Sequence, residues 1–269
     1  MNNEIDHKYL RLFSNFFNRS CLFDLINKKE NKIKKTFLQS SDKTGLCYNH
    51  NIITYEDLFN YLFNIMNSYY KCEYVYLNNI FINEILKNHD DNHVVLTELC
   101  VKDSQADLVI VNGTTTVYEI KTEIDTLARL PKQLDDYVCM FDKIYVITDK
   151  KYLKQVRRLI NKKHSGVGIC LLNTDGTITK IRESKSHISQ LDKNAMFNVL
   201  NRKEFELINK DYYVAKRQFL KLSNKKAHEF YKNALFSRAK NIDYVSNFPD
   251  SLKLAIYKIQ NKLNKNEKK

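Results

Sequence analysis

The stretch DLVIVNGTTTVYEIKTEIDTLARLPKQLDDY, residues Asp107 to Tyr137, holds two short apolar runs on either side of an Asn-Gly pair. Its β-branched residues predict the two strands of a hairpin. The second strand carries Glu119 and Lys121 where a buried strand should stay apolar. Because side chains alternate across a strand, these two share one face and Ile120 lies on the other.

The hairpin loop decides whether Asp107 joins that face. A two-residue Asn-Gly loop would place Asp107 and Glu119 on opposite faces, because a one-residue change of register turns every side chain over. A three-residue loop of Val111, Asn112 and Gly113, with Gly113 in the left-handed position, brings the two carboxylates to one face as a diagonal pair. We predict this odd loop or an equivalent bulge.

Two carboxylates that meet on a sheet repel each other unless a cation lies between them, and oxygen ligands suit Mg²⁺ or Mn²⁺. The main-chain carbonyl of Ile120 is a natural further ligand. Lys121 would place an ammonium where it orients a water or contacts a phosphate. Asp107, Glu119 and Lys121 are therefore a candidate hydrolytic site. The alternative is an ordinary polar strand edge, the usual explanation of an isolated Glu-x-Lys.

The next helix, expected over 125–141, adds two polar residues to this group. Gln133 and Tyr137 are four residues apart and so share one helix face. Pro131 suits the first turn of that helix. Asp125 and Thr126 are expected to cap the helix or to turn the chain into it.

One ordered pattern thus runs through the stretch, and its members are Asp107, Glu119, Ile120, Lys121, Gln133 and Tyr137. The pattern resembles the PD-(D/E)XK nuclease superfamily, in particular its branch with a QxxxY helix. Residues from about 69 to 148 are also similar to an uncharacterised family of bacterial and phage proteins that is named only from a locus tag. The proline of the motif is replaced by Ala106, which leaves the acidic ligand intact.

The resemblance implies a restriction-endonuclease-like fold and metal-dependent hydrolysis of DNA. The roles it implies are metal ligation by Asp107, Glu119 and the Ile120 carbonyl, catalysis by Asp107, Glu119 and Lys121, and substrate binding by Gln133 and Tyr137.

Nucleases of this kind often add an acidic residue from the helix that precedes the sheet. Glu73 and Glu84 are eleven residues apart, three helical turns, on a stripe with Leu77 and Ile80 that should face the sheet. We expect Glu73 to complete the metal site. Glu84 is the second candidate, and Glu98 on the first strand is the third.

The chain is expected to fold in three segments: a helical N-terminal lobe over 1–71, the nuclease-like core over 72–186, and a basic helical lobe over 187–269. In the core, a helix, three strands, and then strands separated by helices predict a mixed α/β sheet flanked by helices. The expected strands are 94–101, 106–111, 115–122, 143–148, and two more within 166–173 and 176–184.

The formal net charge of +13 would attract the chain to polyanions such as nucleic acid. The Asn, Lys and Ile content of an AT-rich genome explains the charge equally well. A basic helix near 150–163 fits either a phosphate track or a solvated helix face. The six cysteines have no zinc spacing.

The sequence therefore predicts a Mg²⁺- or Mn²⁺-dependent deoxyribonuclease in phage or mobile-element biology or in defence. No apolar run reaches the ~18 residues that cross a bilayer, and the first residues lack a signal-peptide pattern, so a cytoplasmic protein without a membrane partner is expected. RNA as substrate, endo or exo action, and a homo-oligomer stay open. The rival is a nuclease-fold protein without turnover that binds nucleic acid or a protein. Site residues on opposite faces, or a salt bridge that occupies Lys121, would favour this rival.

Overall fold

The structure, a computed structural model, describes residues 7–26, 30–44, 54–86, 93–122, 125–173, 177–238 and 250–256. The chain divides into two compact units, one made of 1–87 with 242–269 and the other of 88–241. This division differs from the three expected segments. Helix α4, Glu73–Ile80, groups with the N-terminal helices, whereas the basic helices as far as Phe236 group with the sheet.

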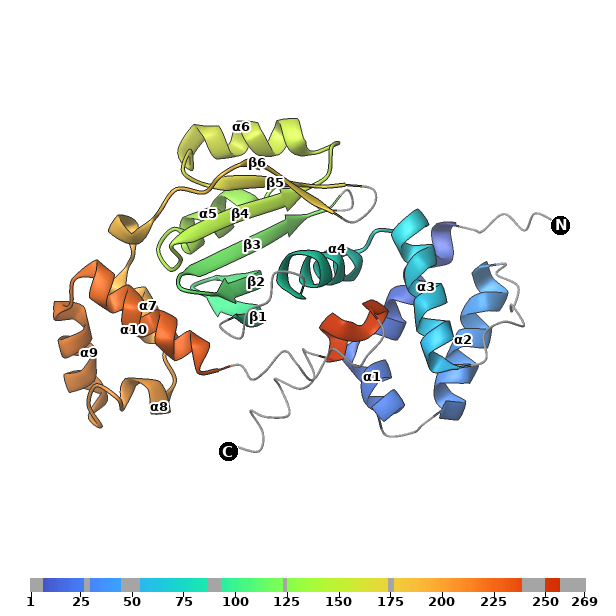
Figure 1. The fold of residues 1–269 in the computed structure, drawn as a ribbon, viewed down its shortest axis with the longest axis horizontal. Coiled ribbons are helices and arrows are strands. Elements are labelled where there is room, and N and C mark those ends of the chain that lie inside the picture. The colour runs from blue at the N-terminus through green and yellow to red at the C-terminus, as the bar shows by residue number, and fades with distance from the viewer. Residues whose placement is uncertain are drawn as a thin grey trace. The chain divides into compact units, whose positions relative to one another are not determined.

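The first unit is helical (Figure 1). Its other elements are a 3₁₀ helix His7–Phe17, α1 Arg19–Ile26, α2 Glu30–Thr44, α3 Tyr55–Tyr69, a π-helical turn Phe81–Leu86 after α4, and a 3₁₀ turn Asp250–Leu252. A capping box starts α3, because Thr54 Oγ1 accepts from Asp57 N at 3.1 Å and Asp57 Oδ2 accepts from Thr54 N at 2.8 Å. Among the described residues, no helix is both long and apolar enough to span a bilayer.

The second unit is built on one six-stranded mixed sheet in the order β1-β2-β3-β4-β5-β6, which confirms the predicted α/β class (Figure 1). The strands are β1 Val94–Val101, β2 Ser104–Val111, β3 Thr115–Lys121, β4 Lys143–Thr148, β5 Gly168–Leu172 and β6 Ile178–Arg182. The pairs β3/β4 and β4/β5 are parallel, and the other three are antiparallel. Helices connect the parallel pairs, as such crossovers require.

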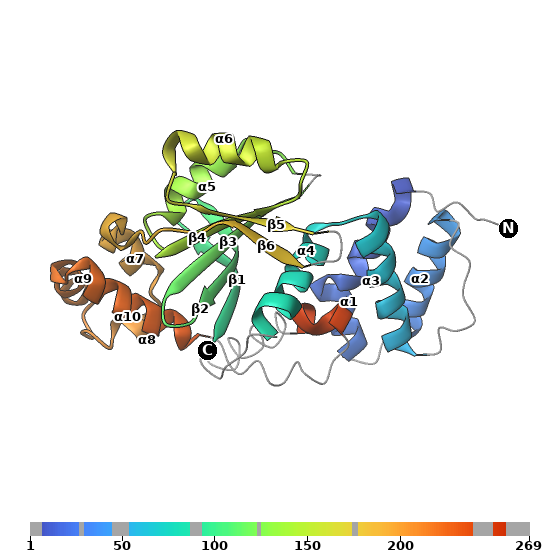
Figure 2. The ribbon, with the colours of Figure 1, turned by 45° about the horizontal axis from the view of Figure 1, so that its top comes forward.

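One face of this sheet carries the main core of the unit. Val109, Val117 and Val146 on that face are fully buried and belong to one cluster with Leu134 and Ile160 from the helices. The helices of the unit are α5 Leu130–Tyr137, α6 Leu153–Lys163, α7 Lys193–Val199, α8 Arg202–Phe205, α9 Tyr212–Lys221 and α10 Asn224–Phe236. In Figures 1 and 2, α5 and α6 lie together on one side of the sheet.

The β2–β3 hairpin has an odd loop, as predicted, but the loop lies one residue later than expected. Pairing continues to Val111 opposite Thr115, so the loop is Asn112, Gly113 and Thr114. Gly113 has φ +76°, a left-handed conformation that glycine adopts without a steric penalty. The shift moves the register by two and keeps every side chain on its predicted face.

A buried polar cluster at the hairpin end of the sheet fastens α10 to β3. The imidazole Nε2 of His228 lies 2.9 Å from Thr115 Oγ1, which itself accepts from Asp142 N at 3.1 Å. Asp142 also accepts a hydrogen bond from Thr114 Oγ1 at 2.7 Å. Burial lowers the pKa of His228, although the nearby Asp142 charge opposes that shift. The imidazole is therefore held in its neutral form.

The cluster makes stability depend on pH. The unfolded chain protonates His228 near the ordinary histidine pKa of about 6.5, whereas the folded protein does so only at lower pH. The unfolded state then binds more protons, so the free energy of unfolding should fall as pH drops from about 7 towards 5. Urea denaturation at a series of pH values measures this slope. His228→Gln should flatten it, and a slope identical to that of the wild type would contradict the assignment.

Candidate functional site

The buried carboxylate of Glu119 is the centre of the candidate site. Its side chain is 1 % exposed and receives three hydrogen bonds from the predicted residues. Lys121 Nζ lies 2.5 Å and Gln133 Nε2 2.6 Å from Glu119 Oε1, and Tyr137 Oη lies 2.6 Å from Oε2. Three residues that were predicted from the sequence therefore lie within hydrogen-bonding distance of a fourth, Glu119.

Asp107 reaches the same place from β2. The ladder between β2 and β3 ends at Leu108 opposite Tyr118, so the next position on each strand sets Asp107 against Glu119 on one face. They are opposed, and not diagonal as predicted, because of the one-residue shift of the loop. Where the ladder stops, Asp107 Oδ2 accepts the main-chain N–H of Ile120 at 2.7 Å.

This bond also gives the direction of the Ile120 carbonyl. In an extended residue the N–H and C=O point to the same neighbouring strand. Since the Ile120 N–H is directed at Asp107, its carbonyl faces the Asp107 side of β3 as well. The Ile120 side chain is buried on the other face of the sheet, as predicted from the alternation.

Helix α5 places its polar face on Glu119. Pro131 lies in its first turn, as predicted, and Gln133 and Tyr137 share the face that meets β3. Tyr137 Oη is also 2.9 Å from Gln105 O. Burial, followed by the charge of Glu119, raises the pKa of Tyr137 well above its usual range, so its hydroxyl remains a donor. The predicted contacts of Gln133 and Tyr137 with substrate stay a prediction; the contacts observed are with Glu119.

Lys121 and Glu119 form a buried ion pair. Removing both charges from water is costly, and the pair is sustained here because Gln133 and Tyr137 supply further donors to the same carboxylate. Thr148 Oγ1 donates to Lys121 O at 3.1 Å and fixes the strand at this point. Asp107, Glu119 and Lys121 lie on one face of the sheet, as expected of a hydrolytic site. The ion pair that occupies Lys121 is instead the feature expected of a protein without turnover.

The oxygen atoms of the site fit a hard divalent cation. Asp107 and Glu119 supply carboxylates, and Gln133 Oε1 is a buried amide oxygen with no hydrogen-bond partner. Mg²⁺ is commonly held by one or two carboxylates, with water and phosphate completing its shell. Among the described residues, no group of three or more His, Cys, Asp and Glu side chains is arranged to hold a metal. The donor set for a cation is thus two carboxylates with main-chain and amide oxygens.

The three candidates for an additional acidic ligand are placed differently. Glu73, in the first turn of α4, is exposed, unlike Leu77 and Ile80 of the expected stripe, and it belongs to the other unit. The side chain of Glu84 lies outside the described residues. Glu98 is exposed and adopts φ 55°. The strand register on either side of it, Thr97 opposite Leu108 and Leu99 opposite Ala106, sets Glu98 across from Asp107, but the regular β1–β2 register skips this position. A left-handed conformation at a residue other than glycine is uncommon and strained.

Sequence reasoning missed the residues that fix the backbone around Lys121. Thr148 is one of them, and its only sequence signal is its position at the end of β4. Asp125 has the expected turn role, because its Oδ2 accepts from Thr122 N at 2.7 Å and from Thr122 Oγ1 at 2.8 Å. Gln105 contributes through its main-chain carbonyl, so its side-chain type gives no signal.

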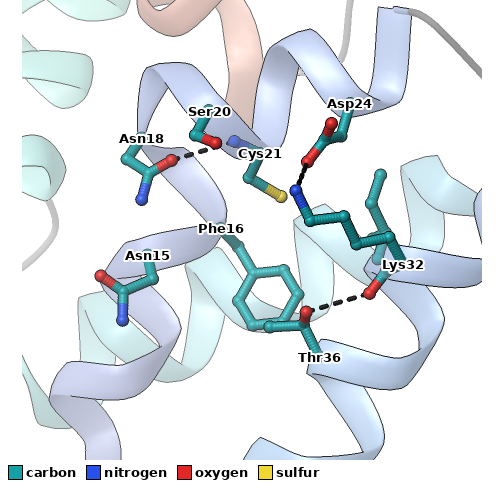
Figure 3. Close-up of a pocket in the computed structure, with 9 residues that line it drawn as sticks. Asn15, Phe16, Asn18, Ser20, Cys21, Asp24, Lys32 and Thr36 are labelled. Atoms are coloured by element: carbon teal, nitrogen blue, oxygen red, sulfur yellow. Dashed lines mark hydrogen bonds and ion pairs between the residues drawn. The ribbon is translucent and has the colours of Figure 1, made fainter. Parts of the chain in front are cut away.

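A small cavity of about 150 Å³ in the first unit is a separate polar site (Figure 3). Its charged residues neutralise each other, since Lys32 Nζ lies 2.5 Å from Asp24 Oδ2. Burial raises the pKa of Cys21 to about 11, which keeps the thiol protonated at neutral pH and weakly nucleophilic. This cavity therefore lacks the activated groups that hydrolysis needs.

The hydroxyl of Tyr137 should stabilise the fold as well as the site. Tyr137→Phe keeps the ring but removes one donor to the buried Glu119, which should lower the free energy of unfolding by about 1–3 kcal/mol. Urea denaturation measures the loss. Tyr213→Phe is the matched control, because that side chain is 75 % exposed and the change should stay within about 0.5 kcal/mol. Equal effects of the two substitutions would refute the predicted contribution.

Comparison with known proteins gives a phage relationship. Over 90 residues the chain is 27 % identical to Protein cII of Enterobacteria phage P4, a match that covers 33 % of each protein. The chain thus matches a third of the length of that relative. No solved structure matches the chain.

The family comparison extends further along the chain. It matches residues 66–253 to the family described as Bacteriophage P4 protein cII. The predicted phage association is confirmed at this level, although the matching family is not one named from a locus tag. Neither description states an activity or a substrate. Since the match spans more than half of the chain, the protein belongs to the bacteriophage P4 protein cII family.

Proposed function

We propose that this phage-family protein is a metal-dependent nuclease of the PD-(D/E)XK type that hydrolyses phosphodiester bonds in DNA. The observation that supports the proposal best is the convergence of Asp107, Glu119 and Lys121 at the end of one hairpin, where the β2–β3 ladder stops. Two carboxylates with an adjacent ammonium are suited to a cation and a phosphate.

In this proposal Asp107, Glu119 and the Ile120 carbonyl hold Mg²⁺ or Mn²⁺. When bound, the ion supplies a Lewis acid that lowers the pKa of a coordinated water and offsets charge on the phosphate. Gln133 and Tyr137 keep the Glu119 carboxylate in one orientation through bonds of 2.6 Å each. Fixing that carboxylate in advance removes part of the cost of organising the site.

Lys121 assists the attack on the substrate while it contacts the Glu119 carboxylate. An ammonium has three N–H donors, and one of them is directed at Glu119 Oε1. The others can be offered to a water or to a phosphate oxygen. Thr148 and Asp125 act as positioning residues, because together they hold the peptide unit that joins Lys121 to Thr122.

One observation favours a second candidate function, a nuclease-like protein that binds nucleic acid or a protein without turnover. The Lys121 ammonium neutralises Glu119 directly, and Gln133 and Tyr137 satisfy the rest of the carboxylate. A carboxylate with three donors has less to gain from a cation than an unpaired one. The two functions differ in whether a divalent ion competes successfully with Lys121 for Glu119.

Cleavage assays separate these functions. Wild-type protein with Mg²⁺ or Mn²⁺ should cleave at least one of linear, nicked, branched or single-stranded DNA, and EDTA should abolish the cleavage. Asp107→Asn and Lys121→Gln should each reduce the rate by about a hundredfold or more, because each removes a charge from the reacting centre. Assaying RNA under the same conditions shows whether the substrate is DNA or RNA, which the sequence leaves open.

The controls keep folding apart from catalysis. Asp103→Asn removes a carboxylate that is exposed and pairs with Lys132 on the surface, so its rate should equal that of the wild type. Denaturation curves show whether each variant is folded at the assay temperature. Equal activity of wild type, Asp107→Asn and Lys121→Gln would contradict the proposed site. DNA binding without cleavage under all metal conditions would favour the second candidate.

A further inference from the structure

Helix α6 carries a concentration of positive charge that the candidate site does not use. Residues 150–163 contain no Asp or Glu and seven basic side chains, all exposed. They are Lys150, Lys151, Lys154, Arg157, Arg158, Lys162 and Lys163. Lys163 pairs with Asp135 at 2.6 Å. The remaining six give this part of the surface a strong single sign of charge.

The charges form a stripe along one side of the helix. Lys154, Arg157, Arg158 and Lys162 follow the spacing of three and four that puts residues on one helix face, here called the α6 basic face. Lys154 and Lys162 lie about 12 Å apart along the helix axis. Single-strand phosphates advance by about 3.4 Å along a duplex, so this length matches three to four of them.

The α6 basic face begins near the candidate site. Thr148, the last residue of β4, pairs with Lys121 in the parallel ladder and donates to its carbonyl. Lys150 and Lys151 follow within three residues. Tyr152 Oη lies 3.4 Å from Asp125 O, in the turn that leaves β3. A polyanion bound along α6 would therefore extend towards the end of the sheet that holds Asp107 and Glu119.

Helix α8 of this unit shows what an ordinary solvated face looks like. Arg202, which is 84 % exposed, pairs with Glu206 four residues later at 2.7 Å. By contrast, α6 has no acidic residue of its own to pair with. Like charges also lie close together here. Burial lowers the pKa of Arg182 on the neighbouring strand β6, and repulsion from the Arg157 charge lowers it further. A bound polyanion would relieve this repulsion.

A membrane surface is a poorer partner for the same helix. Basic amphipathic helices bind bilayers by inserting an apolar face below the headgroups. The apolar face of α6 is already used, since Val156 and Ile160 are fully buried in the core cluster of the unit. Only the charged face is exposed, which suits a phosphate backbone that is contacted from outside.

We propose that the α6 basic face, Lys154, Arg157, Arg158 and Lys162 with Lys150 and Lys151 ahead of it, binds the phosphate backbone of DNA and leads it to the end of β3. Backbone binding itself does not depend on turnover, whereas the delivery of a scissile bond rests on the proposed nuclease function.

The test compares two full-length fourfold variants made in the Asp107→Asn background. One carries Lys154→Gln, Arg157→Gln, Arg158→Gln and Lys162→Gln, and the other carries Lys203→Gln, Lys210→Gln, Arg217→Gln and Lys225→Gln as an equal loss of exposed charge. Fluorescence anisotropy with a labelled 30-base-pair duplex in EDTA gives the Kd at several KCl concentrations. The α6 variant should bind about tenfold or more weakly, with the slope of log K against log salt reduced by about 3 to 4. The control should change the slope by less than about 1.

Each outcome decides one of the two proposals. Equal losses in the two variants, or an unchanged slope for α6, would overturn the α6 basic face. A second result would overturn the α6 basic face in favour of an anionic membrane. In that result the Asp107→Asn parent binds vesicles containing phosphatidylserine, the α6 variant does not, and neither of the two binds DNA. If DNA binding depends on α6 while the wild type cleaves no substrate, the binding face stands and the nuclease proposal fails.

Discussion

The burial of the Glu119 carboxylate is the constraint around which the candidate site is organised. A carboxylate that is removed from water must receive hydrogen bonds or opposite charge, because an unpaired one would cost several kcal/mol or more. Lys121 supplies the charge, and Gln133 and Tyr137 supply further donors. Strand β3 and helix α5 are thereby held in one arrangement by polar contacts inside an apolar core, and a cation could share the same oxygen atoms.

The hairpin and the parallel strands determine which residues lie beside the buried Glu119. The β2–β3 ladder ends one position before Asp107 and Glu119, so the Asp107 side chain accepts the Ile120 N–H that a longer ladder would have bonded to the main chain of β2. Strand β4, paired in parallel with β3, places Thr148 beside Lys121 and starts the connection to α6 at the same end of the sheet. A candidate catalytic centre and a basic surface therefore follow from one topological feature, the common end of β3 and β4.

Much of this arrangement could be predicted from the sequence because it depends on periodicity. Alternation along β3 gave the shared face of Glu119 and Lys121, and the i, i+4 spacing gave the shared face of Gln133 and Tyr137. The loop was placed one residue too early, since Gly113 fits the left-handed position of either loop and only pairing at Val111 and Thr115 distinguishes them. Side-chain partners were beyond prediction: spacing cannot show that Gln133 and Tyr137 would turn to Glu119, or that Glu73 would be exposed in another unit.

We propose that Asp107 and Glu119 bind a divalent cation together, and crystals soaked in Mn²⁺ show whether they do. An anomalous density peak should lie within about 2.5 Å of both carboxylates, with Lys121 moved from Glu119 Oε1, and Glu119→Gln crystals should have no peak there. An unchanged contact between Lys121 and Glu119, with no peak between the carboxylates at saturating Mn²⁺, would rule out the shared cation and favour a protein that binds nucleic acid or a protein without catalysis.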